Sequence, residues 1–193
     1  SGTASSSTVL YGDQTYKAEP GLTGWAVDGG NNDLLPASAS AGIYLGVSSA
    51  VAENLLDDYE EGNWTPVFSE EGGSLSVTYN KQLGNYVKIG GFVMLTGSIL
   101  VTSVSGGSGG PLKLGGFPFA NNASADTDFT TAVLVGKSSG FGTANPTSGY
   151  WRCGQTEAYL AYRSSTTDYS LSLGSHVTSS DEFYTTICYY TTA

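Results

Sequence analysis

Charged side chains are scarce in this sequence. They make up 12% of its 193 residues, compared with about 25% in an average soluble domain. Seven Lys and Arg stand against 17 Asp and Glu, which gives a formal net charge of −10. The few cations are scattered singly, so the chain lacks the basic surface that releases counterions from phosphate groups. We therefore expect no nucleic-acid partner.

Cysteine and histidine are also rare. The two cysteines, Cys153 and Cys188, are too few for a disulfide scaffold, and the single histidine leaves a Cys/His metal site short of ligands. The cysteines fall on different predicted strands, and a disulfide between them requires neighbouring strands with Cα atoms about 5.5 Å apart. Because thiols are usually buried, we expect both to be reduced and half-buried. We expect no metal and no other cofactor.

Long apolar runs are missing. The sequence contains no run of 18 apolar residues, so we expect no membrane insertion. The opening residues SGTAS have neither the basic start nor the apolar centre of a secretion signal. The chain is therefore expected either to act without secretion or to have lost a signal.

Glycine, tyrosine, serine and threonine are abundant, with 27 Gly and 13 Tyr. Hydrophobic residues still make up 39% of the chain, which argues against general disorder. From Trp64 onward apolar residues alternate with hydroxyl residues, as at Leu75, Val77 and Tyr79, and this period of two is typical of half-buried strands. The pattern predicts an all-β protein of about eight or nine antiparallel strands, arranged as a β-sandwich or jelly roll.

The most apolar of these strands spans residues 92–102. One of its faces is predicted to lie in the core, with Val93, Leu95, Ile99 and Val101. The opposite face carries Phe92, Met94 and Leu100, where an ordinary sandwich strand is polar. A second buried surface is therefore needed, and an interface between identical subunits would provide it.

Three local patterns add structural expectations. Residues 80–85 predict a turn, and the pair Gly90 and Gly91 predicts a bulge or kink. Residues 50–61 form the only segment with a helical pattern. The glycine-rich loop at 106–110 lacks the Lys-Ser/Thr pair that would mark a phosphate-binding loop.

The first third of the chain has too few apolar side chains for an independent core. Residues 9–16 are expected to form one short strand or a turn. The apolar residues are predicted to pack against copies of the chain or another protein, the candidates being Val9, Leu10, Tyr11, Tyr16 and Trp25. We therefore predict an attachment arm over 1–36, a connector over 37–62 and a self-sufficient sandwich over 63–193.

An acidic run in the connector has the residue type of the paired carboxylates in glycan hydrolases. It consists of Asp57, Asp58, Glu60 and Glu61. The catalytic acid and base of a hydrolase must lie on either side of the scissile bond, and carboxylates that are neighbours in sequence on a connector rarely do so. A solvated or ion-neutralised linker face is therefore favoured.

The remaining candidate chemistry is also thin. His176 lies near Ser175 and Asp181, but no Gly-x-Ser-x-Gly elbow supports a catalytic triad. Asp126 and Asp128 lack the twelve-residue ligand loop of a calcium site. We therefore expect no enzymatic activity.

Aromatic residues are the stronger pattern, with three Trp, 13 Tyr and seven Phe. Tyr and Trp offer a flat apolar face with a polar edge, which suits contact with sugar rings. The candidate glycan- or receptor-binding residues, expected to be exposed, are Phe141, Tyr150, Trp151, Tyr162, Tyr189 and Tyr190. The alternative is that these aromatics cover a subunit interface or cap the sandwich.

Five short motifs occur in an order that resembles a known family. LLDDYEEGNWTPVF spans 55–68; GIYLG precedes it at 42–46, and YVKIG at 86–90 and FPF at 117–119 follow it. Farther upstream, VLYGDQTY at 9–16 is similar to a segment nearer the root of the same proteins. Together the motifs resemble bacteriophage tail-fibre proteins whose C-terminal knob is a trimeric, jelly-roll-like β-sandwich.

The resemblance implies a homotrimer packed about one axis, with an extended and intertwined N-terminal arm. The residues expected at the trimer interface are Phe92, Met94, Leu100, Tyr44, Leu45, Tyr59 and Trp64. It also implies a virion protein assembled in the host cytoplasm. The arm would bind another virion protein, and the knob would bind a surface glycan or outer-membrane receptor of the host.

Three other functions remain open at this point. The chain could be a structural virion fibre of the collar, head or decoration type that binds no receptor. It could be a depolymerase that cleaves surface polysaccharide, or a secreted carbohydrate-binding module.

Overall fold

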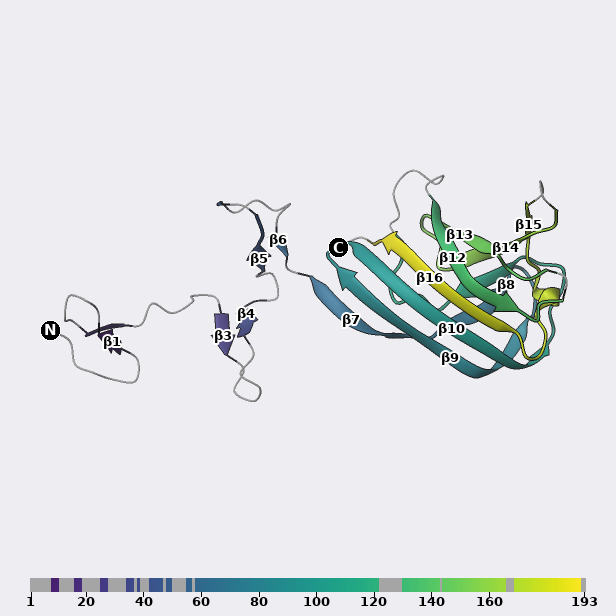
Figure 1. The fold of residues 1–193 in the computed structure, drawn as a ribbon, viewed down its shortest axis with the longest axis horizontal. Coiled ribbons are helices and arrows are strands. Elements are labelled where there is room, and N and C mark those ends of the chain that lie inside the picture. Colours follow the sequence, from purple (N-terminus) through teal and green to yellow (C-terminus); the bar gives the residue numbers. More distant parts are fainter. Residues whose placement is uncertain are drawn as a thin grey trace. The chain divides into compact units, whose positions relative to one another are not determined.

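The computed structural model describes residues 8–10, 16–18, 25–27, 34–36, 38, 42–46, 48–49, 55–56, 58–121, 130–142, 144–165 and 169–191. The chain divides into two compact units, Ser1–Asp57 and Asp58–Ala193 (Figure 1). The boundary lies inside the acidic run of the predicted connector. Each unit is described by itself below.

The first unit contains three small antiparallel pairs of strands. They are β1 (Thr8–Leu10) with β2 (Tyr16–Ala18), β3 (Trp25–Val27) with β4 (Leu34–Pro36), and β5 (Ile43–Tyr44) with β6 (Leu55–Leu56). Several apolar side chains of these pairs are exposed, namely Leu34, Leu35, Ile43, Tyr44 and Leu45. Isolated two-stranded pairs are marginally stable in water, so these described residues form no core of their own.

The second unit is one antiparallel sheet of ten strands. The strands are β7 (Tyr59–Trp64), β8 (Val67–Glu70), β9 (Ser76–Ile89), β10 (Phe92–Ser105), β11 (Leu112–Gly115), β12 (Thr130–Ser139), β13 (Ser148–Arg152), β14 (Ala158–Arg163), β15 (Tyr169–Leu171) and β16 (Glu182–Tyr190). Their order in the sheet is β7-β9-β10-β16-β12-β13-β14-β11-β8, and β15 pairs with β14. The predicted all-β class and antiparallel pairing are confirmed.

The sheet folds over on itself. Strands β7 and β8 stand at opposite ends of the strand order, although only Thr65 and Pro66 separate them in the chain. Two residues span only about 7 Å, so both ends of the sheet must come together. The result is a sandwich-like fold in which β7, β9, β10, β16 and β12 form one layer, with β13, β14 and β8 behind it (Figure 1).

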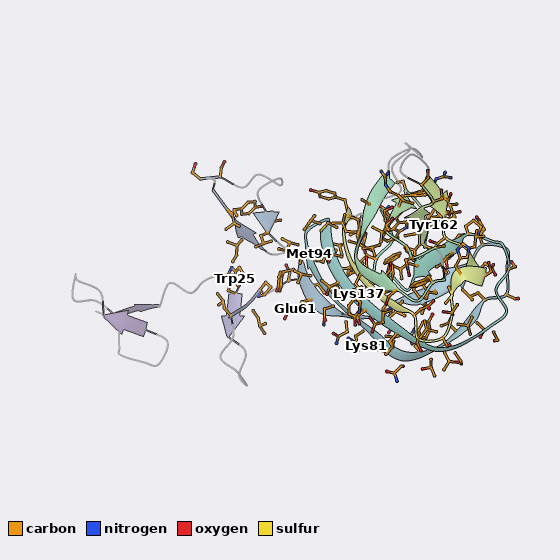
Figure 2. All side chains as sticks on the ribbon, turned by 45° about the vertical axis from the view of Figure 1, so that its right-hand side comes forward. Trp25, Glu61, Lys81, Met94, Lys137 and Tyr162 are labelled. Atoms are coloured by element: carbon orange, nitrogen blue, oxygen red, sulfur yellow. The ribbon has the colours of Figure 1, made fainter. Side chains whose placement is uncertain are left out.

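Side chains fill the space between the layers (Figure 2). The predicted core face of β10 is confirmed, because Val93, Leu95, Ile99 and Val101 are 0 to 2% exposed. Aromatic rings pack around them. Phe117 stacks on Trp64 with ring centroids 5.4 Å apart and on Trp151 with centroids 4.0 Å apart.

Trp64 lies in a slot made by two glycines. Gly84 on β9 and Gly97 on β10 are paired across the strands, and the indole rests against both. A Cβ atom on Gly97 would lie 2.8 Å from the indole, and one on Gly84 would clash with its nitrogen. The Trp64 Nε1–H donates a hydrogen bond to the Thr96 carbonyl at 2.8 Å. Both positions must therefore be glycine, because the Trp64 indole closely approaches the backbone there. Glycine within a strand often marks such a close approach.

Three local expectations are wrong. Residues 80–85 form no turn, because β9 continues unbroken through them: Lys81 to Asn85 pair with β10, and Gly84 and Asn85 also pair with β7. Gly90 and Gly91 form the two-residue turn between β9 and β10 rather than a bulge, and Gly90 has a φ of 55°. The long pairing with β10 outweighs the turn preference of Asn and Lys.

The expected helix over 50–61 is also wrong for its described residues. Leu55 and Leu56 form β6, and Tyr59 to Glu61 lie in β7 opposite residues of β9. Residues 50–54 and 57 lie outside the described residues. In the part of the chain that the structure describes, no helix is long and apolar enough to cross a membrane.

We predict that Gly84→Ala lowers the free energy of unfolding of the second unit by about 1–3 kcal/mol, because the added methyl group must displace Trp64. Urea unfolding of the full chain, followed by tryptophan fluorescence, measures the change. Gly109→Ala is the control, since a Cβ there has no neighbour within 4 Å, and it should change stability by at most about 0.5 kcal/mol. Equal effects of the two substitutions would contradict the role of the slot.

Candidate functional site

One layer of the second unit presents an outward face that is only partly polar. Strands β7, β9, β10, β16 and β12 turn one set of side chains into the core and the other set outward. The exposed large apolar side chains on this outward face are Tyr59, Leu83, Ile89, Phe92, Met94, Leu134 and Tyr190. An exposed apolar patch on a sheet with one solvated face usually marks a contact surface.

The apolar residues gather at one end of this face. Strand pairing places Tyr59, Ile89, Phe92 and Tyr190 in one row across β7, β9, β10 and β16. The Phe92 and Tyr190 rings meet edge to face with centroids 5.7 Å apart.

The next row continues this surface. Met94 lies between Val87 and Cys188 in the strand pairing. We call the seven residues the apolar end: Tyr59, Ile89, Phe92, Tyr190, Val87, Met94 and Cys188.

The three predicted interface residues of β10 differ in how exposed their side chains are. Phe92 and Met94 do face away from the core and are exposed, as expected. Leu100 is on the same face but half-buried, and Thr96 and Ser98 separate it from Met94. The apolar surface therefore stops at Met94 instead of running along the whole strand.

Trp64 was expected at a subunit interface, and this expectation is wrong. Its side chain is 5% exposed and fills the glycine slot in the core. Tyr59 is exposed at the apolar end, and Tyr44 and Leu45 are exposed in the first unit. Their place in a trimer stays a prediction.

The proposed arm residues lie in the small strand pairs of the first unit. Val9 and Leu10 belong to β1, Tyr16 to β2 and Trp25 to β3. Trp25 is half-buried. Tyr11 lies outside the described residues.

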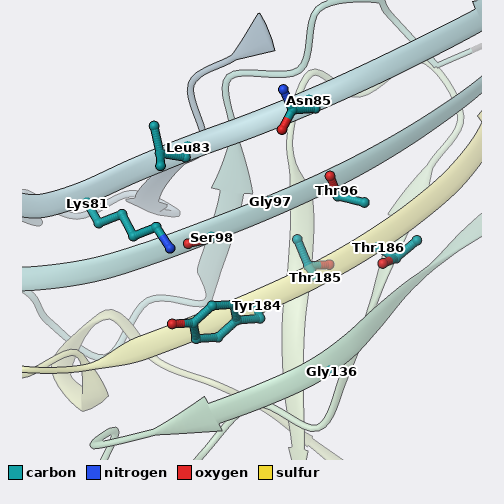
Figure 3. A pocket seen from close by; sticks show the side chains of 10 residues that line it. All are labelled: Lys81, Leu83, Asn85, Thr96, Gly97, Ser98, Gly136, Tyr184, Thr185 and Thr186. Atoms are coloured by element: carbon teal, nitrogen blue, oxygen red, sulfur yellow. The ribbon is translucent and has the colours of Figure 1, made fainter.

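Farther along the outward face, beyond the apolar end, the surface is hollowed. The hollow has a volume of about 420 Å³ and is shown in Figure 3. The residues that line it are Lys81, Leu83, Asn85, Thr96, Gly97, Ser98, Gly136, Tyr184, Thr185 and Thr186. Most of the polar groups among them are hydroxyls.

Two lysines flank the Tyr184 ring beside the hollow. The ammonium of Lys81 is 5.5 Å from the ring centroid and that of Lys137 is 5.7 Å from it. A hydrogen bond to Glu182 raises the pKa of Lys137, and the charge of Glu182 acts in the same direction. Both cations are therefore held near an aromatic face, which attracts them electrostatically.

Of the six predicted glycan-binding aromatics, three are buried, Tyr150 and Tyr162 are half-buried, and only Tyr190 is exposed. Phe141 and Trp151 are 0% exposed and Tyr189 is 2% exposed, all within the core cluster. The Tyr189 hydroxyl donates to the Phe119 carbonyl at 3.0 Å, and burial raises the pKa of Tyr189. The expected exposure of these three residues is wrong, and their rings offer no surface for a sugar.

The other three predicted aromatics do not form one site. Tyr150 stacks on Tyr159 with centroids 5.2 Å apart, and the Arg152 guanidinium lies 5.5 Å from the Tyr150 ring. Tyr162 meets His176 edge to face. Tyr190 is exposed at the apolar end.

The two cysteines form no disulfide, as expected. Cys153 is buried, in a turn after β13 rather than on a strand. Cys188 is exposed on β16, where it belongs to the apolar end. Neither thiol is half-buried.

The described residues of the acidic run form an ion pair and hydrogen bonds with β7 and β9 at the start of the second unit, instead of lining a cleft. Asp58 forms an ion pair with the buried Lys88, and its carbonyl accepts a hydrogen bond from the Gly90 N–H at 2.7 Å. The Tyr86 hydroxyl donates to Glu60, and the Tyr59 hydroxyl donates to Glu61 at 3.0 Å. Asp57 lies outside the described residues. For Asp58 the ion-neutralised alternative is favoured.

His176 and Asp181 each have a structural partner. The Leu173 N–H donates to His176 Nδ1 at 3.0 Å, and partial burial lowers the pKa of His176. Asp181 is fully buried and accepts hydrogen bonds from the Thr178 N–H and hydroxyl. Burial raises the pKa of Asp181 despite these bonds.

No metal cluster is found in the described ranges, where no three His, Cys, Asp or Glu side chains gather suitably. Asp126 and Asp128 fall outside those ranges.

A carboxylate that sequence reasoning missed, that of Glu70 on β8, contacts the glycine-rich loop at 106–110. Glu70 Oε1 accepts hydrogen bonds from the Ser108 N–H at 2.6 Å, the Ser108 hydroxyl at 2.8 Å and the Gly110 N–H at 3.1 Å. A Cβ on Gly73 or Gly174 would clash with this carboxylate. The loop is therefore an anion cradle, although it lacks the motif of a phosphate-binding loop, and its anion is a side chain of the same chain.

Comparison of the chain with protein-family models, with curated proteins and with solved structures finds no match.

We predict that the contribution of Glu70 to stability depends on pH. Partial burial acts to raise the pKa of Glu70, but the hydrogen bonds from Ser108, Gly110 and Ser74 outweigh it and lower the pKa. A carboxyl whose pKa is lower in the folded state stabilises the fold above its unfolded pKa of about 4.3. This stability is lost as the pH falls through the folded pKa.

Glu70→Gln should therefore be less stable than the wild type at pH 7, and the difference should shrink as the pH falls below about 4.3. Urea unfolding of both proteins at several pH values between about 7 and 3 measures this difference. Ser108→Ala removes one donor and should give a smaller loss with the same pH dependence. A difference that stays constant with pH would contradict the assignment.

Proposed function

We propose that this chain is a fibre protein of a bacterial virus, which assembles as a homotrimer and binds the host surface through residues 63–193. The observation that carries the proposal is the apolar end. It is an exposed apolar surface on a unit that already has a complete core of its own. Such a surface is costly in water and is satisfied by association.

The position of the apolar end in the chain supports self-association along a fibre. Tyr59, at the start of β7, belongs to the apolar end and follows the first unit directly in the sequence. The first unit exposes apolar side chains of its own, among them Leu34, Leu35 and Ile43. Three identical chains would cover both sets at once, because each copy brings the same surfaces to a closed ring.

Two features support binding of the host surface: a hollow on the outward face of the second unit, and the presence of three copies in the proposed trimer. The outward face carries a hydroxyl-rich hollow beyond the apolar end. Contacts of modest strength become effective when three copies act together, since the second and third contacts form at a high effective concentration. The function needs no reaction, and the carboxylates near His176 and in the connector are engaged in structural contacts.

We predict a trimer of the full chain by light scattering, and a shift to monomers for Met94→Asp. Met94 is exposed in the single chain, so the substitution leaves the fold intact, while a charge buried without a partner opposes the interface. Thr102→Asp is the control, because Thr102 is an exposed residue of the same strand outside the apolar end. It should remain trimeric.

Cys188 gives an independent measure of the same contact. In the wild type it should react slowly with a maleimide, and in Met94→Asp it should react quickly, because the interface no longer covers it. Peptide mass spectrometry separates it from the buried Cys153. A wild-type chain that is monomeric, with a fully reactive Cys188, would overturn the trimer proposal.

We predict that purified chain in excess inhibits adsorption of the virus to its host cells. The free knob competes for the same surface receptor. Counting unadsorbed particles at increasing concentrations of chain measures the effect. Unchanged adsorption would instead support a structural fibre without receptor binding.

A further inference from the structure

The hollow on the outward face has a floor of hydroxyl groups and one apolar wall, and strand register explains why. Its central strands carry small hydroxyl side chains, with Thr96 and Ser98 on β10 and Thr186 on β16. On one side, Leu83 of β9 lies opposite Ser98 and is 60% exposed. On the other side the lining residue of β12 is Gly136, which has no side chain. Small residues beside a protruding leucine leave a depression.

The floor also has an unused hydrogen-bonding group. The Ser98 hydroxyl is buried and has no hydrogen-bond partner among the described residues. Burying a hydroxyl without a partner is unfavourable, so such a group is unusual in a stable fold. Figure 3 shows the ammonium end of Lys81 directed toward Ser98 on the neighbouring strand. A ligand that draws Lys81 outward would uncover this hydroxyl.

Lys81 supplies charge that the rest of the chain does not neutralise. Among the described lysines of the second unit, Lys88 pairs with Asp58, Lys113 with Glu71 and Lys137 with Glu182. Lys81 has no carboxylate within ion-pair distance in the described part of the chain, and its contact is the Tyr184 ring. This available cation is notable in a chain with a net charge of −10.

The second aromatic cluster of the unit is less suited to a ligand. There the Tyr150 and Tyr159 rings stack on each other, and the Tyr159 hydroxyl donates to Glu71. Lys113 lies over Tyr159 and pairs with Glu71. The Tyr159 hydroxyl and the Lys113 ammonium therefore already have partners within the chain.

We propose that the hollow binds an acidic saccharide, one that bears a carboxylate or phosphate group. This inference rests on the proposed function and locates the receptor site within it. The Leu83 side chain contacts the C–H face of a sugar ring, and the hydroxyls of Thr96, Ser98 and Thr186 form hydrogen bonds with its hydroxyls. Lys81 pairs with the acidic group. The volume of about 420 Å³ is within the range of small-ligand sites.

An array of purified bacterial capsular and lipopolysaccharide glycans, neutral and acidic, tests the proposal with the full-length chain. The wild type should bind acidic members, and binding should fall when their carboxylates are reduced or their phosphates removed. Lys81→Met should weaken binding about tenfold or more, the usual effect of losing one charge-assisted hydrogen bond. Thr186→Leu fills the hollow and should abolish binding.

Thr78→Leu is the matched control, because Thr78 is an exposed threonine of β9 outside the hollow, and it should bind as the wild type does. Binding that Thr186→Leu leaves intact, or binding to neutral glycans alone, would overturn the proposal. So would the absence of binding to every glycan of the array. A Leu83→Cys thiol that is protected from labelling only in the trimer would show that a second copy occupies the hollow, which also overturns it, because Leu83 is 60% exposed in the single chain.

The adsorption assay separates this inference from the function on which it rests. If the wild type and Thr186→Leu inhibit adsorption equally, the knob binds the host through another surface and only the hollow is wrongly assigned. If the wild type does not inhibit adsorption at all, receptor binding itself is wrong. Inhibition by the wild type and the Thr78→Leu control, but not by Thr186→Leu, supports both.

Discussion

The packing of Trp64 determines how the second unit can fold. This residue ends β7, an edge strand, and its indole lies across the paired Gly84 and Gly97 while bonding the Thr96 carbonyl. The same indole stacks on Phe117, which follows β11 near the other end of the sheet. One side chain thus joins the first layer to the second. Because β8 begins only three residues later, the two ends of the sheet must lie close together and the sheet closes over its core.

A core filled in this way leaves the outward face without cover. The inward positions of β10 are all used, so the residues between them must point away, including Phe92 and Met94. In a sequence that is poor in charge, these outward positions are apolar at one end and hydroxyl-bearing farther along. The core and the candidate contact surfaces therefore follow from one alternating pattern on the same strands.

The sequence predicts those parts of the structure that depend on local periodicity. The all-β class, the core face of β10 and the outward position of Phe92 and Met94 follow from the period of two. The turn expected at 80–85 fails because the long pairing of β9 with β10 outweighs residue preference.

The candidate site was less predictable, because it depends on long-range relations. Alternation could have shown that Trp151 faces inward if Tyr150 faces outward, but the pattern does not say which of the two does. Glu70 meets a loop about forty residues away, and no local motif marks that contact. The hollow arises only from the register of four strands.

Two roles on one face impose a geometric condition on any trimer. A polar row of Asn63, Asn85, Thr96 and Thr186 crosses β7, β9, β10 and β16 between the apolar end and the deeper part of the hollow. If three copies pack through Tyr59, Phe92 and Met94 alone, the hollow stays open beyond this row. If they pack along the whole face, the hydroxyl floor is buried against a partner and must find hydrogen bonds there. Because the row is hydrophilic and Leu100 is half-buried, desolvation favours the shorter interface in the proposed trimer, and the proposed saccharide site would then remain accessible.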